Sequence, residues 1–319
     1  MINVNNSTNN SLKKFYNKRD KNSFGRRLFR EWPLHMMLVP GLLLVFIFNY
    51  IPMYGIVIAF QRYNVARGFN SPWVGLDNFT LLFSQPNFVR TISNTLFIAL
   101  WKIALGIIVP VFFSLLLNEI RKPLSKRLFQ TVIYMPNFIS WVILAGIMIE
   151  ILSPGGVVNR FLGLFNIAPI WFLGDQSVFP WTMIWSDVWR SFGFGTIIYL
   201  ATLTSIDPGL YEAATMDGAK RFKQTIYITL PLMMPIIMLM TILAMGNVLN
   251  AGFDQIVNLY APIVWETGDI IDTYIFRVGL EQAQFSLGAA VGLLRSLISA
   301  VLIIISYWLA DRFAGYRVF

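Results

Sequence analysis

Residues Ile206–Pro231, with the sequence IDPGLYEAATMDGAKRFKQTIYITLP, form a polar and partly basic stretch between two long apolar runs. An apolar run of about 20 residues is long enough to cross a lipid bilayer as a helix. The stretch is therefore predicted to be a loop between two membrane helices, and the charges around it decide the fold class.

The composition of the whole chain supports a membrane protein. Of its 319 residues, 56% are hydrophobic and only 13% are charged, whereas soluble domains carry about 25% charged residues. The net charge of +9 comes from basic residues that flank apolar runs, which favours membrane lipid over nucleic acid as the partner. The sequence has no cysteine, one histidine and no phosphate-binding loop, so no metal site is predicted and ATP is not expected to bind this chain.

The apolar runs predict an all-α, multi-pass protein. Backbone polar groups in lipid must be paired within the segment, so the runs are expected to be helices. Six transmembrane helices are predicted: Met36–Phe60, Ile92–Leu117, Leu128–Leu152, Trp181–Leu203, Ile226–Asn250 and Leu287–Ala310. A cleavable signal peptide is the alternative for the first, but that run is long and lacks a clear cleavage site.

Loop charges predict the orientation. Basic residues gather on the loops that share a side with the N-terminus, and this side is expected to be cytoplasmic. The inner set comprises the eight N-terminal basic residues, Arg121, Lys122, Lys126, Arg127, Lys220, Arg221, Lys223, Arg312 and Arg317. Both termini are therefore predicted to be cytoplasmic. The long outer loops Gly155–Ser177 and Ala251–Phe285 are either functional or hold Trp and Tyr at the lipid interface.

This topology divides the chain into four parts. Residues 1–35 form a cytoplasmic basic segment, and residues 36–90 form the first transmembrane helix and an extracellular loop. Residues 91–312 form a core of five transmembrane helices that includes the cytoplasmic loop 204–225, and residues 313–319 form a cytoplasmic tail.

Within the cytoplasmic loop, a short helix is predicted. Asp207 is a favourable N-cap, and Pro208 suits the first helical position. The helix is expected to run through Met216 and to end at Asp217-Gly218, since glycine readily adopts the left-handed conformation. Its small residues allow close approach of another surface, which is typical of an element that inserts into a partner's groove.

The spacing of residues in this loop resembles a known family. Glu212-Ala213-Ala214, Gly218, Ile228 and Leu230-Pro231 match every fixed position of the EAA signature of ABC-importer inner-membrane permeases. Further stretches resemble the carbohydrate branch of that family: Tyr50-Ile51-Pro52-Met53-Tyr54-Gly55, Trp73-Val74-Gly75-Leu76, Asn94-Thr95-Leu96, Leu117-Asn118-Glu119, Phe138-Ile139-Ser140-Trp141, Gly252-Phe253 and Asp272-Thr273-Tyr274.

The resemblance covers nearly the whole chain and is greatest to the polysaccharide and complex-oligosaccharide permeases of Gram-positive bacteria. It implies a permease core in the bacterial cell membrane that imports sugars and has no catalytic residue. It also implies four kinds of partner or ligand: a second similar permease subunit, two cytosolic ATPases that bind ATP and Mg²⁺, an extracellular substrate-binding lipoprotein, and membrane lipid. The chain lacks the extra N-terminal helices and the large extracellular insertion of the maltose-type larger subunit.

The same resemblance implies the coupling residues. The EAA helix of the family sits in a cleft on an ATPase, so contact or shape-critical roles are expected for Glu212, Ala213, Ala214 and Gly218, with Tyr211 and Asp217 beside them.

Polar side chains at the end of the fifth predicted span are candidates for the substrate path. Asn247 and Asn250 are expected to share a helix face, with Asp254 one turn later, and amides and carboxylates suit sugar hydroxyls. In related sugar permeases this region lines the path. Hydrogen bonding between helices is the alternative role.

Charged residues within spans are expected to have a structural or functional role, because each costs about 2.5–3.5 kcal/mol at the bilayer centre on insertion scales. Asp187 and Arg190 either neutralise each other, three residues apart on one helix, or line a cavity. Lys102 and Arg295 are expected to snorkel or to pair with a neighbouring subunit.

Three other functions remain open from the sequence. An ion-coupled transporter or channel without an ATPase requires a deep coupling carboxylate and often repeats, and no repeat is evident. An ABC importer subunit for a non-sugar solute would share the EAA signature. A sensory or scaffold protein is disfavoured, because no signalling domain is attached.

Overall fold

The structure of the chain is a computed structural model that describes residues 31–314. Residues 1–30 and 315–319, which hold most of the predicted basic segment and most of the predicted tail, lie outside the described residues. The chain divides into two compact units, Met1–Val57 and Ile58–Phe319, and each is considered by itself.

The described part of the first unit is an apolar helical rod. It begins with α3 (Trp32–Val45), continues through a π-helical turn (Phe46–Tyr50) and ends in a 3₁₀ helix (Ile51–Phe60) whose last residues belong to the second unit. Helical turns thus run over 29 residues from Trp32 to Phe60, with the composition of a membrane span. The predicted first span is confirmed, although the helix begins four residues before the predicted Met36.

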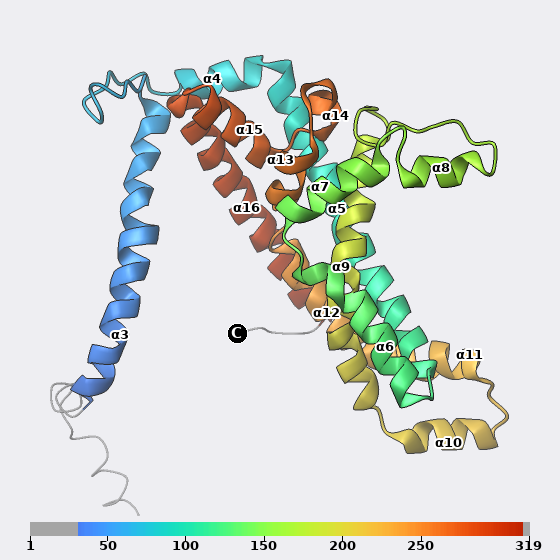
Figure 1. Ribbon diagram of the computed structural model, residues 1–319. Coiled ribbons are helices and arrows are strands. Elements are labelled where there is room, and N and C mark those ends of the chain that lie inside the picture. Colours follow the sequence, from blue (N-terminus) through green and yellow to red (C-terminus); the bar gives the residue numbers. More distant parts are fainter. Residues whose placement is uncertain (1–30, 315–319) are drawn as a thin grey trace, which may run out of the picture. The chain divides into compact units, whose positions relative to one another are not determined.

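The second unit is a bundle of helices with short elements at its two ends (Figure 1). The longer helices are α5 (Pro86–Glu119), α6 (Pro123–Tyr134), α7 (Trp141–Leu152), α9 (Phe179–Thr204), α12 (Leu230–Met245) and α16 (Phe285–Ala314). The shorter ones are α4 (Asp77–Ser84), α8 (Val157–Gly163), α10 (Pro208–Met216), α11 (Arg221–Gln224), α13 (Phe253–Leu259), α14 (Trp265–Gly268) and α15 (Ile271–Tyr274). Among the described residues, strand-type pairing is confined to isolated bridges.

Five helices in the described part of the chain are long and apolar enough to cross a membrane: Trp32–Phe60, Pro86–Glu119, Trp141–Gly163, Arg221–Met245 and Phe285–Ser306. The fourth predicted span, Trp181–Leu203, is not among these five but is present as α9, which has 26 residues. Polar and charged residues within α9, including Asp187 and Arg190, lower its hydropathy. It packs against α5 along much of its length and forms the centre of the bundle.

The predicted third span, Leu128–Leu152, is not one continuous helix. α6 passes into a 3₁₀ turn at Met135–Phe138, and α7 begins afresh at Trp141. Pro136 lacks a backbone N–H, and the hydroxyl of Ser140 accepts a hydrogen bond from the amide of Ile143 as a new N-cap. The break separates α6, with its basic start, from α7.

The long segment 251–285, predicted as an outer loop, is folded into the bundle. It contains α13, α14, α15 and a π-helical stretch at Ile275–Glu281. Its side chains Ile256, Ile270 and Ile271 are fully buried with residues of α5, α7 and α9 in the main hydrophobic core. Such burial gives the segment a structural role in addition to any contact outside.

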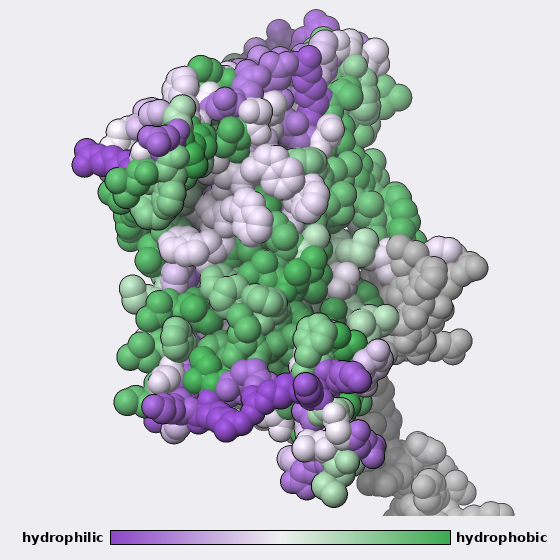
Figure 2. All heavy atoms as spheres, turned by 90° about the vertical axis from the view of Figure 1, so that its right-hand side faces the viewer, coloured by the Kyte–Doolittle hydropathy of each residue, from purple (hydrophilic) through white to green (hydrophobic). Residues whose placement is uncertain are grey.

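The short elements gather at two opposite ends of this unit. Figure 1 shows α4, α8 and α14 at one end and α10 and α11 at the other, as the loop charges predicted for elements on opposite sides of the membrane. On the face shown in Figure 2, a broad hydrophobic band separates two hydrophilic ends. The band agrees with a lipid-embedded bundle.

Candidate functional site

Helix α10 has the capped start that the sequence predicted. Asp207 is its N-cap, and the carboxylate oxygen Oδ1 accepts a 2.9 Å hydrogen bond from the amide of Gly209. Pro208 occupies the first helical position, where a missing N–H costs nothing.

The end of α10 is also confirmed. Gly218 has φ +77°, in the left-handed region. Its amide donates to the carbonyl of Thr215 at 3.0 Å, and the amide of Ala219 donates to that of Ala214 at 2.9 Å. These two bonds form the Schellman arrangement, which pairs carbonyls that a helix end leaves free. The chain thereby turns back toward the membrane.

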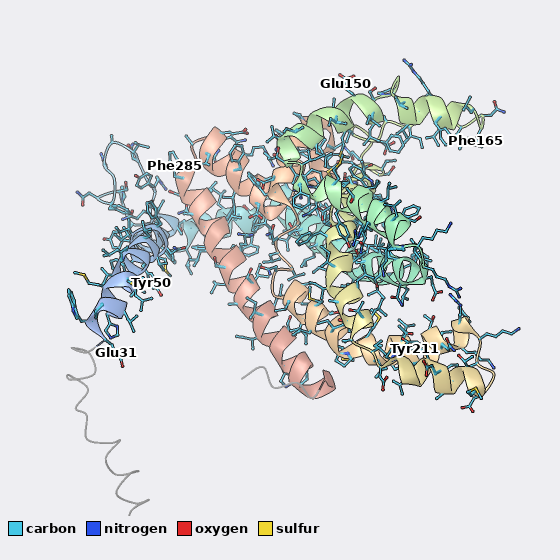
Figure 3. All side chains as sticks on the ribbon, turned by 60° about the horizontal axis from the view of Figure 1, so that its bottom comes forward. Glu31, Tyr50, Glu150, Phe165, Tyr211 and Phe285 are labelled. Carbon is cyan, nitrogen blue, oxygen red and sulfur yellow. The ribbon has the colours of Figure 1, made fainter. Side chains whose placement is uncertain are left out.

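The inner side of α10 is tied to the next membrane helix. The hydroxyls of Tyr211 and Thr229 share a 3.0 Å hydrogen bond. The amide nitrogen of Gln224 donates to the Thr215 hydroxyl at 2.9 Å and to the Ala219 carbonyl at 3.2 Å. Tyr211 is therefore half-buried on the side that faces α11 and α12. Figure 3 marks its position, at the opposite end of the unit from Glu150 and Phe165.

The other side of α10 is free of the bundle. Glu212 and Ala213 are exposed, Ala214 is half-buried, and Asp217 and Gly218 are exposed. Met216 is 88% exposed, and Phe222 of α11 is 77% exposed. Met216 and Phe222 belong to the short helices α10 and α11 at one end of the unit. Large exposed apolar side chains are typical of surfaces that contact other proteins.

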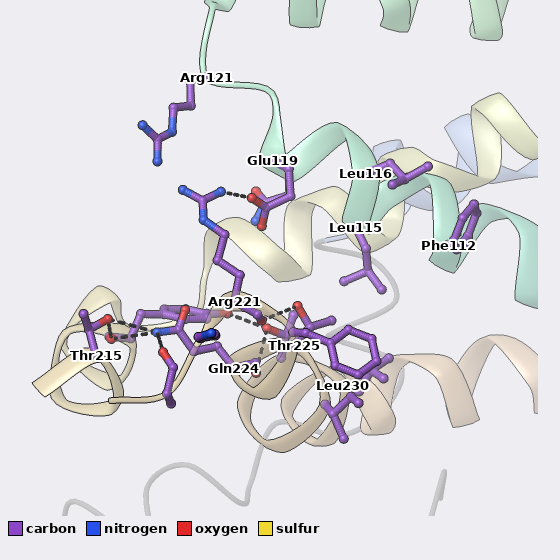
Figure 4. Close-up of a pocket in the computed structure, with 17 residues that line it drawn as sticks. Phe112, Leu115, Leu116, Glu119, Arg121, Thr215, Arg221, Gln224, Thr225 and Leu230 are labelled. Carbon is purple, nitrogen blue, oxygen red and sulfur yellow. Dashed lines mark hydrogen bonds and ion pairs between the residues drawn. The ribbon is translucent and has the colours of Figure 1, made fainter. Parts of the chain in front are cut away.

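A groove of about 1110 Å³ separates this loop from the end of α5 (Figure 4). Its walls include Phe112, Leu115 and Glu119 from α5, and Tyr211 and Thr215 from α10. Arg221 reaches across and forms an ion pair with Glu119. The loop that contains α10 and α11 is thus held to two membrane helices, α5 and α12.

Within the membrane region, Lys102 of α5 is buried and held by acceptors of its own chain; Lys102, its acceptors and Asp187 are called the Lys102 clamp below. Its side chain is 8% exposed; Nζ donates to the carbonyl of Ala251 at 2.8 Å and to Oε1 of Gln255, and lies 3.8 Å from the Asp187 carboxylate. The expectation that Lys102 snorkels or pairs with another subunit is therefore wrong. Snorkelling requires a free path to water, and this side chain is buried among acceptors of its own chain.

Gln255 completes the clamp. It is fully buried, and its amide nitrogen donates to the Met183 carbonyl at 2.8 Å and to the Ser186 hydroxyl at 2.7 Å. Gly252 makes room for the ammonium, because an added Cβ there would lie 2.7 Å from Nζ of Lys102. The clamp joins α5, α9 and α13 at one point.

A cavity of about 390 Å³ opens beside this clamp. It brings together three of the predicted path residues, Asp187, Asn247 and Asn250, with Lys102 and Tyr199. Asp254 does not line the cavity and is exposed in α13. Amide, carboxylate, ammonium and phenol groups around one space can each hydrogen-bond to a polyhydroxylated ligand.

The predicted helical face for Asn247, Asn250 and Asp254 is not present. α12 ends at Met245, Asn247 lies in the turn that follows, and the amide of Asn250 donates to the carbonyl of Asn247 at 2.8 Å. Gly252, with φ +97°, then redirects the chain into α13. Asn247 and Asn250 both line the cavity because of this turn, whereas Asp254 lies in α13, outside the cavity.

Asp187 and Arg190 do not pair with each other. Arg190 donates from Nε to the carbonyl of Ile139 at 3.1 Å and from Nη2 to that of Asn137 at 3.2 Å, and its guanidinium lies 5.0 Å from the Trp141 ring centre. It thereby contacts the break between α6 and α7. Of the two, only Asp187 lines the cavity.

Arg295 also has an intrachain partner. Its guanidinium lies 3.0 Å from the carboxylate of Asp272 in α15, so the expectation of snorkelling or of a neighbouring-subunit partner is wrong here too. A local sequence pattern gave no indication of this pair, because 23 residues separate the two side chains.

The segment around α14 and α15 is held to α5 by hydrogen bonds. The Thr95 hydroxyl accepts from the amide of Ile271 at 2.9 Å, and Asn94 donates to the carbonyl of Glu266 at 3.0 Å. Asp269 is buried, accepts from the Thr273 hydroxyl at 2.7 Å and forms an ion pair with Arg277. Burial raises the pKa of the Asp269 carboxyl, against the opposing effects of Thr273 and Arg277.

Sequence reasoning missed Gln255 of the clamp and the exposed apolar pair Met216 and Phe222. Met216 and Phe222 were detectable, since large apolar residues stand out in a polar loop. Gln255 carried no such signal, because its partners lie 69 to 153 residues away.

The fold agrees with comparisons to known proteins. Residues 102–315 match the family model described as "binding-protein-dependent transport system inner membrane component", and the chain belongs to this family. It is a multi-pass membrane permease.

Individual relatives cover nearly the whole chain. It is 40% identical over 289 residues to the polygalacturonan/rhamnogalacturonan transport system permease protein YteP of Bacillus subtilis, with 90% of each chain covered. It is 27% identical over 292 residues to the arabinooligosaccharides transport system permease protein AraP of the same organism, with 88% of this chain and 89% of that one covered. Its fold matches a chain in the crystal structure of a bacterial alginate ABC transporter in complex with an alginate pentasaccharide-bound periplasmic protein. That match has a TM-score of 0.84 and 35% identity, and covers 92% of this chain and 99% of that chain.

Proposed function

We propose that this chain is a transmembrane permease subunit of an ATP-driven importer of oligosaccharides or polysaccharide fragments. A saccharide cargo is supported by its relatives, which are named as transporters of polygalacturonan or rhamnogalacturonan, arabino-oligosaccharides and alginate. The chain translocates and does not hydrolyse ATP. ATP and Mg²⁺ bind to a partner.

One observation carries the coupling proposal. Helix α10 is capped at both ends, exposes Glu212, Ala213 and Met216, and is bonded on its inner side to the start of α12. Because α10 is joined to the membrane helices by these bonds, a movement of α10 is transmitted to those helices. The shape of α10 fits a cleft on a cytosolic ATPase. This chain pairs with a second permease subunit, and each of the two permease subunits contacts one ATPase.

The mechanism follows from these attachments. When ATP closes the two ATPases, the α10 helices are drawn together, and α12 and α5 move with them through Thr229 and the Glu119–Arg221 pair. Switching a two-state bundle from 1:99 to 99:1 takes about 5.5 kcal/mol of differential binding, which ATP binding to the partner supplies. An extracellular binding protein delivers the sugar to the outward-open state.

Sugar passage uses the cavity beside α5 and α9. Asn247, Asn250 and Asp187 offer hydrogen bonds to hydroxyl groups, and Lys102 lies in the wall behind them. Asp254 is proposed to contact sugar only outside this cavity. Replacing Asn250 with Ala is expected to weaken transport, since one hydrogen bond contributes about 0.5–1.5 kcal/mol.

The coupling proposal is tested by purification of the full chain with its co-encoded neighbours. An ATPase and a second permease are expected to copurify in a stable complex with ATPase activity that rises when the binding protein and an oligosaccharide are added. A chain that purifies without any ATPase, at expression levels where both are made, contradicts the proposal.

A further inference from the structure

The groove between the end of α5 and the loop that contains α10 and α11 is charged at one end and apolar at the other. Arg121, which follows α5, lies at the same end as the Glu119–Arg221 pair, and Phe112 and Leu116 lie at the other end (Figure 4). The groove volume of about 1110 Å³ exceeds the roughly 300–1,000 Å³ of pockets that hold small ligands. Its size and polarity therefore suit a large amphiphile.

The groove lies where the membrane-spanning parts of two helices end. The helical segments long and apolar enough to cross a membrane run over Pro86–Glu119 and Arg221–Met245. Phe112, within the first of these segments, is 55% exposed, whereas Arg121 and Lys220 lie just outside the two segments. The groove thus extends from the depth of the hydrocarbon to the depth of the lipid headgroups.

The charges that line the groove are mostly positive. They comprise Arg121, Lys220 and Arg221, against the single carboxylate of Glu119, which is already paired with Arg221. Among the described residues, neither Arg121 nor Lys220 forms an ion pair, and both are exposed. Two unpaired cations beside an apolar groove at a membrane boundary favour an anionic lipid, because lipid phosphates attract Lys and Arg there.

The groove is separate from the surface of α10 that is proposed to contact the ATPase. Glu212, Ala213 and Met216 of that surface do not line the groove. Tyr211 and Thr215, which are hydrogen-bonded toward the bundle, do line it. An ATPase seated on the outer side of α10 therefore does not need the groove.

We propose that this groove binds one anionic phospholipid of the inner leaflet. The lipid phosphate pairs with Arg121 and Lys220 through charge-assisted hydrogen bonds, and the acyl chains lie against Phe112 and Leu116. The bound lipid connects the end of α5 to the start of α11. The inference goes beyond the proposed function and rests on it in one respect, since it takes this end of the unit to be cytoplasmic.

Binding is measured by native mass spectrometry of the purified complex in detergent. The complex is titrated with phosphatidylglycerol or with phosphatidylcholine of the same acyl chains. Wild type is expected to bind phosphatidylglycerol about 20-fold more tightly, because phosphatidylcholine has no net charge and each of the two cations contributes about fivefold. Equal binding of the two lipids overturns the inference.

A matched pair of double variants separates this site from general attraction to the basic end of the unit. Arg121→Gln/Lys220→Gln removes both unpaired cations and is expected to weaken phosphatidylglycerol binding about 20-fold. Lys122→Gln/Lys223→Gln is the control, because it removes the same charge from exposed positions nearby that do not line the groove. An equal loss of binding in the two double variants contradicts the inference.

Two further measurements test for the acyl chains. Phe112→Ala is expected to weaken binding severalfold, since the apolar contact is reduced, whereas Phe129→Ala, on α6 outside the groove and 52% exposed, should bind as wild type does. Free glycerol phosphate should not displace the lipid. Unchanged binding by Phe112→Ala, or displacement by glycerol phosphate at equal concentration, shows a soluble phosphate site and overturns the inference.

The remaining occupant to distinguish is a partner subunit. If Arg121→Gln/Lys220→Gln prevents the second permease or the ATPase from copurifying, the groove is a protein interface and the inference is wrong. A chain that purifies without any ATPase, yet prefers phosphatidylglycerol and loses this preference in the same double variant, contradicts the proposed function and leaves the lipid site standing.

Discussion

Lys102 shows what a single charged residue contributes to this bundle. The sequence indicated that a lysine in a membrane span needs compensation, and the structure supplies it through Ala251, Gln255 and Asp187. The need to compensate the charge of Lys102 could be predicted, because the cost of burying a charge in a membrane span is a property of that residue alone. Its partners could not be predicted, because they depend on how α13 folds back against α5.

Removal of the Lys102 ammonium is expected to destabilise the protein. Lys102→Met leaves the Gln255 oxygen without its donor and Asp187 without a countercharge, and breaking such a pair costs about 3 kcal/mol or more. The measurement is thermal unfolding of the detergent-solubilised protein, in which the variant should unfold at a clearly lower temperature.

The double variant Lys102→Met/Asp187→Asn is expected to recover part of that loss, because it removes the unpaired carboxylate as well. Lys122→Met, at the exposed position just before α6, is the control and should unfold as wild type does. If the double variant is no more stable than Lys102→Met, the ion pair contributes little and the hydrogen bonds carry the effect.

Among the elements, α10 was predicted almost to the residue, whereas two membrane helices were not. The signals for α10 are local: an N-cap at Asp207 and a glycine that ends the helix. The break before α7 and the end of α12 at Met245 fall inside apolar runs, where hydropathy shows only that a segment is apolar. Pro136 and Ser140 were the local signals for the first of these.

Gly218 gives a matched test of the α10 end. Its φ of +77° is accessible to asparagine but strained by about 1–2 kcal/mol for other L-residues, most of all β-branched ones. Gly218→Val is expected to displace the end of α10 and to reduce sugar-stimulated ATPase activity severalfold, whereas Gly218→Asn should keep most of it.

Open space surrounds Gly218, so the difference between the two variants reports backbone conformation and not a clash within the chain. Both variants are compared at equal amounts of assembled complex. If valine and asparagine have the same effect, the left-handed turn is not what the coupling requires.

At the scale of the whole molecule, the Glu119–Arg221 pair links the loop that contains α10 and α11 to α5. The two side chains are 51% and 59% exposed, so the pair is expected to matter little for stability. We propose that it couples movement of this loop to α5, which packs along α9 at the centre of the bundle.

Charge reversal tests this link. Glu119→Arg and Arg221→Glu alone each place like charges together and are expected to lower the amount of sugar transported per ATP hydrolysed. The double reversal restores the attraction and should recover most of the ratio. Recovery is measured in proteoliposomes from uptake and phosphate release in the same sample. A double variant as impaired as the singles would show that the pair does not transmit movement.

The deep carboxylates argue against an ion-coupled transporter. Asp187 faces Lys102 and Asp272 faces Arg295, so each already has a cation of this chain beside it. A coupling carboxylate must be free to exchange its ion as the protein alternates between states. The membrane charges of this chain instead join its helices to one another.

The energy source of transport is the most direct test of the account. The permease is reconstituted in vesicles with the ATPases and second permease that copurify with it, and uptake of a labelled oligosaccharide is followed with the binding protein outside. We predict uptake that needs ATP and the binding protein and that persists when ion gradients are dissipated. Uptake that proceeds without ATP and stops when the gradients are removed would contradict it.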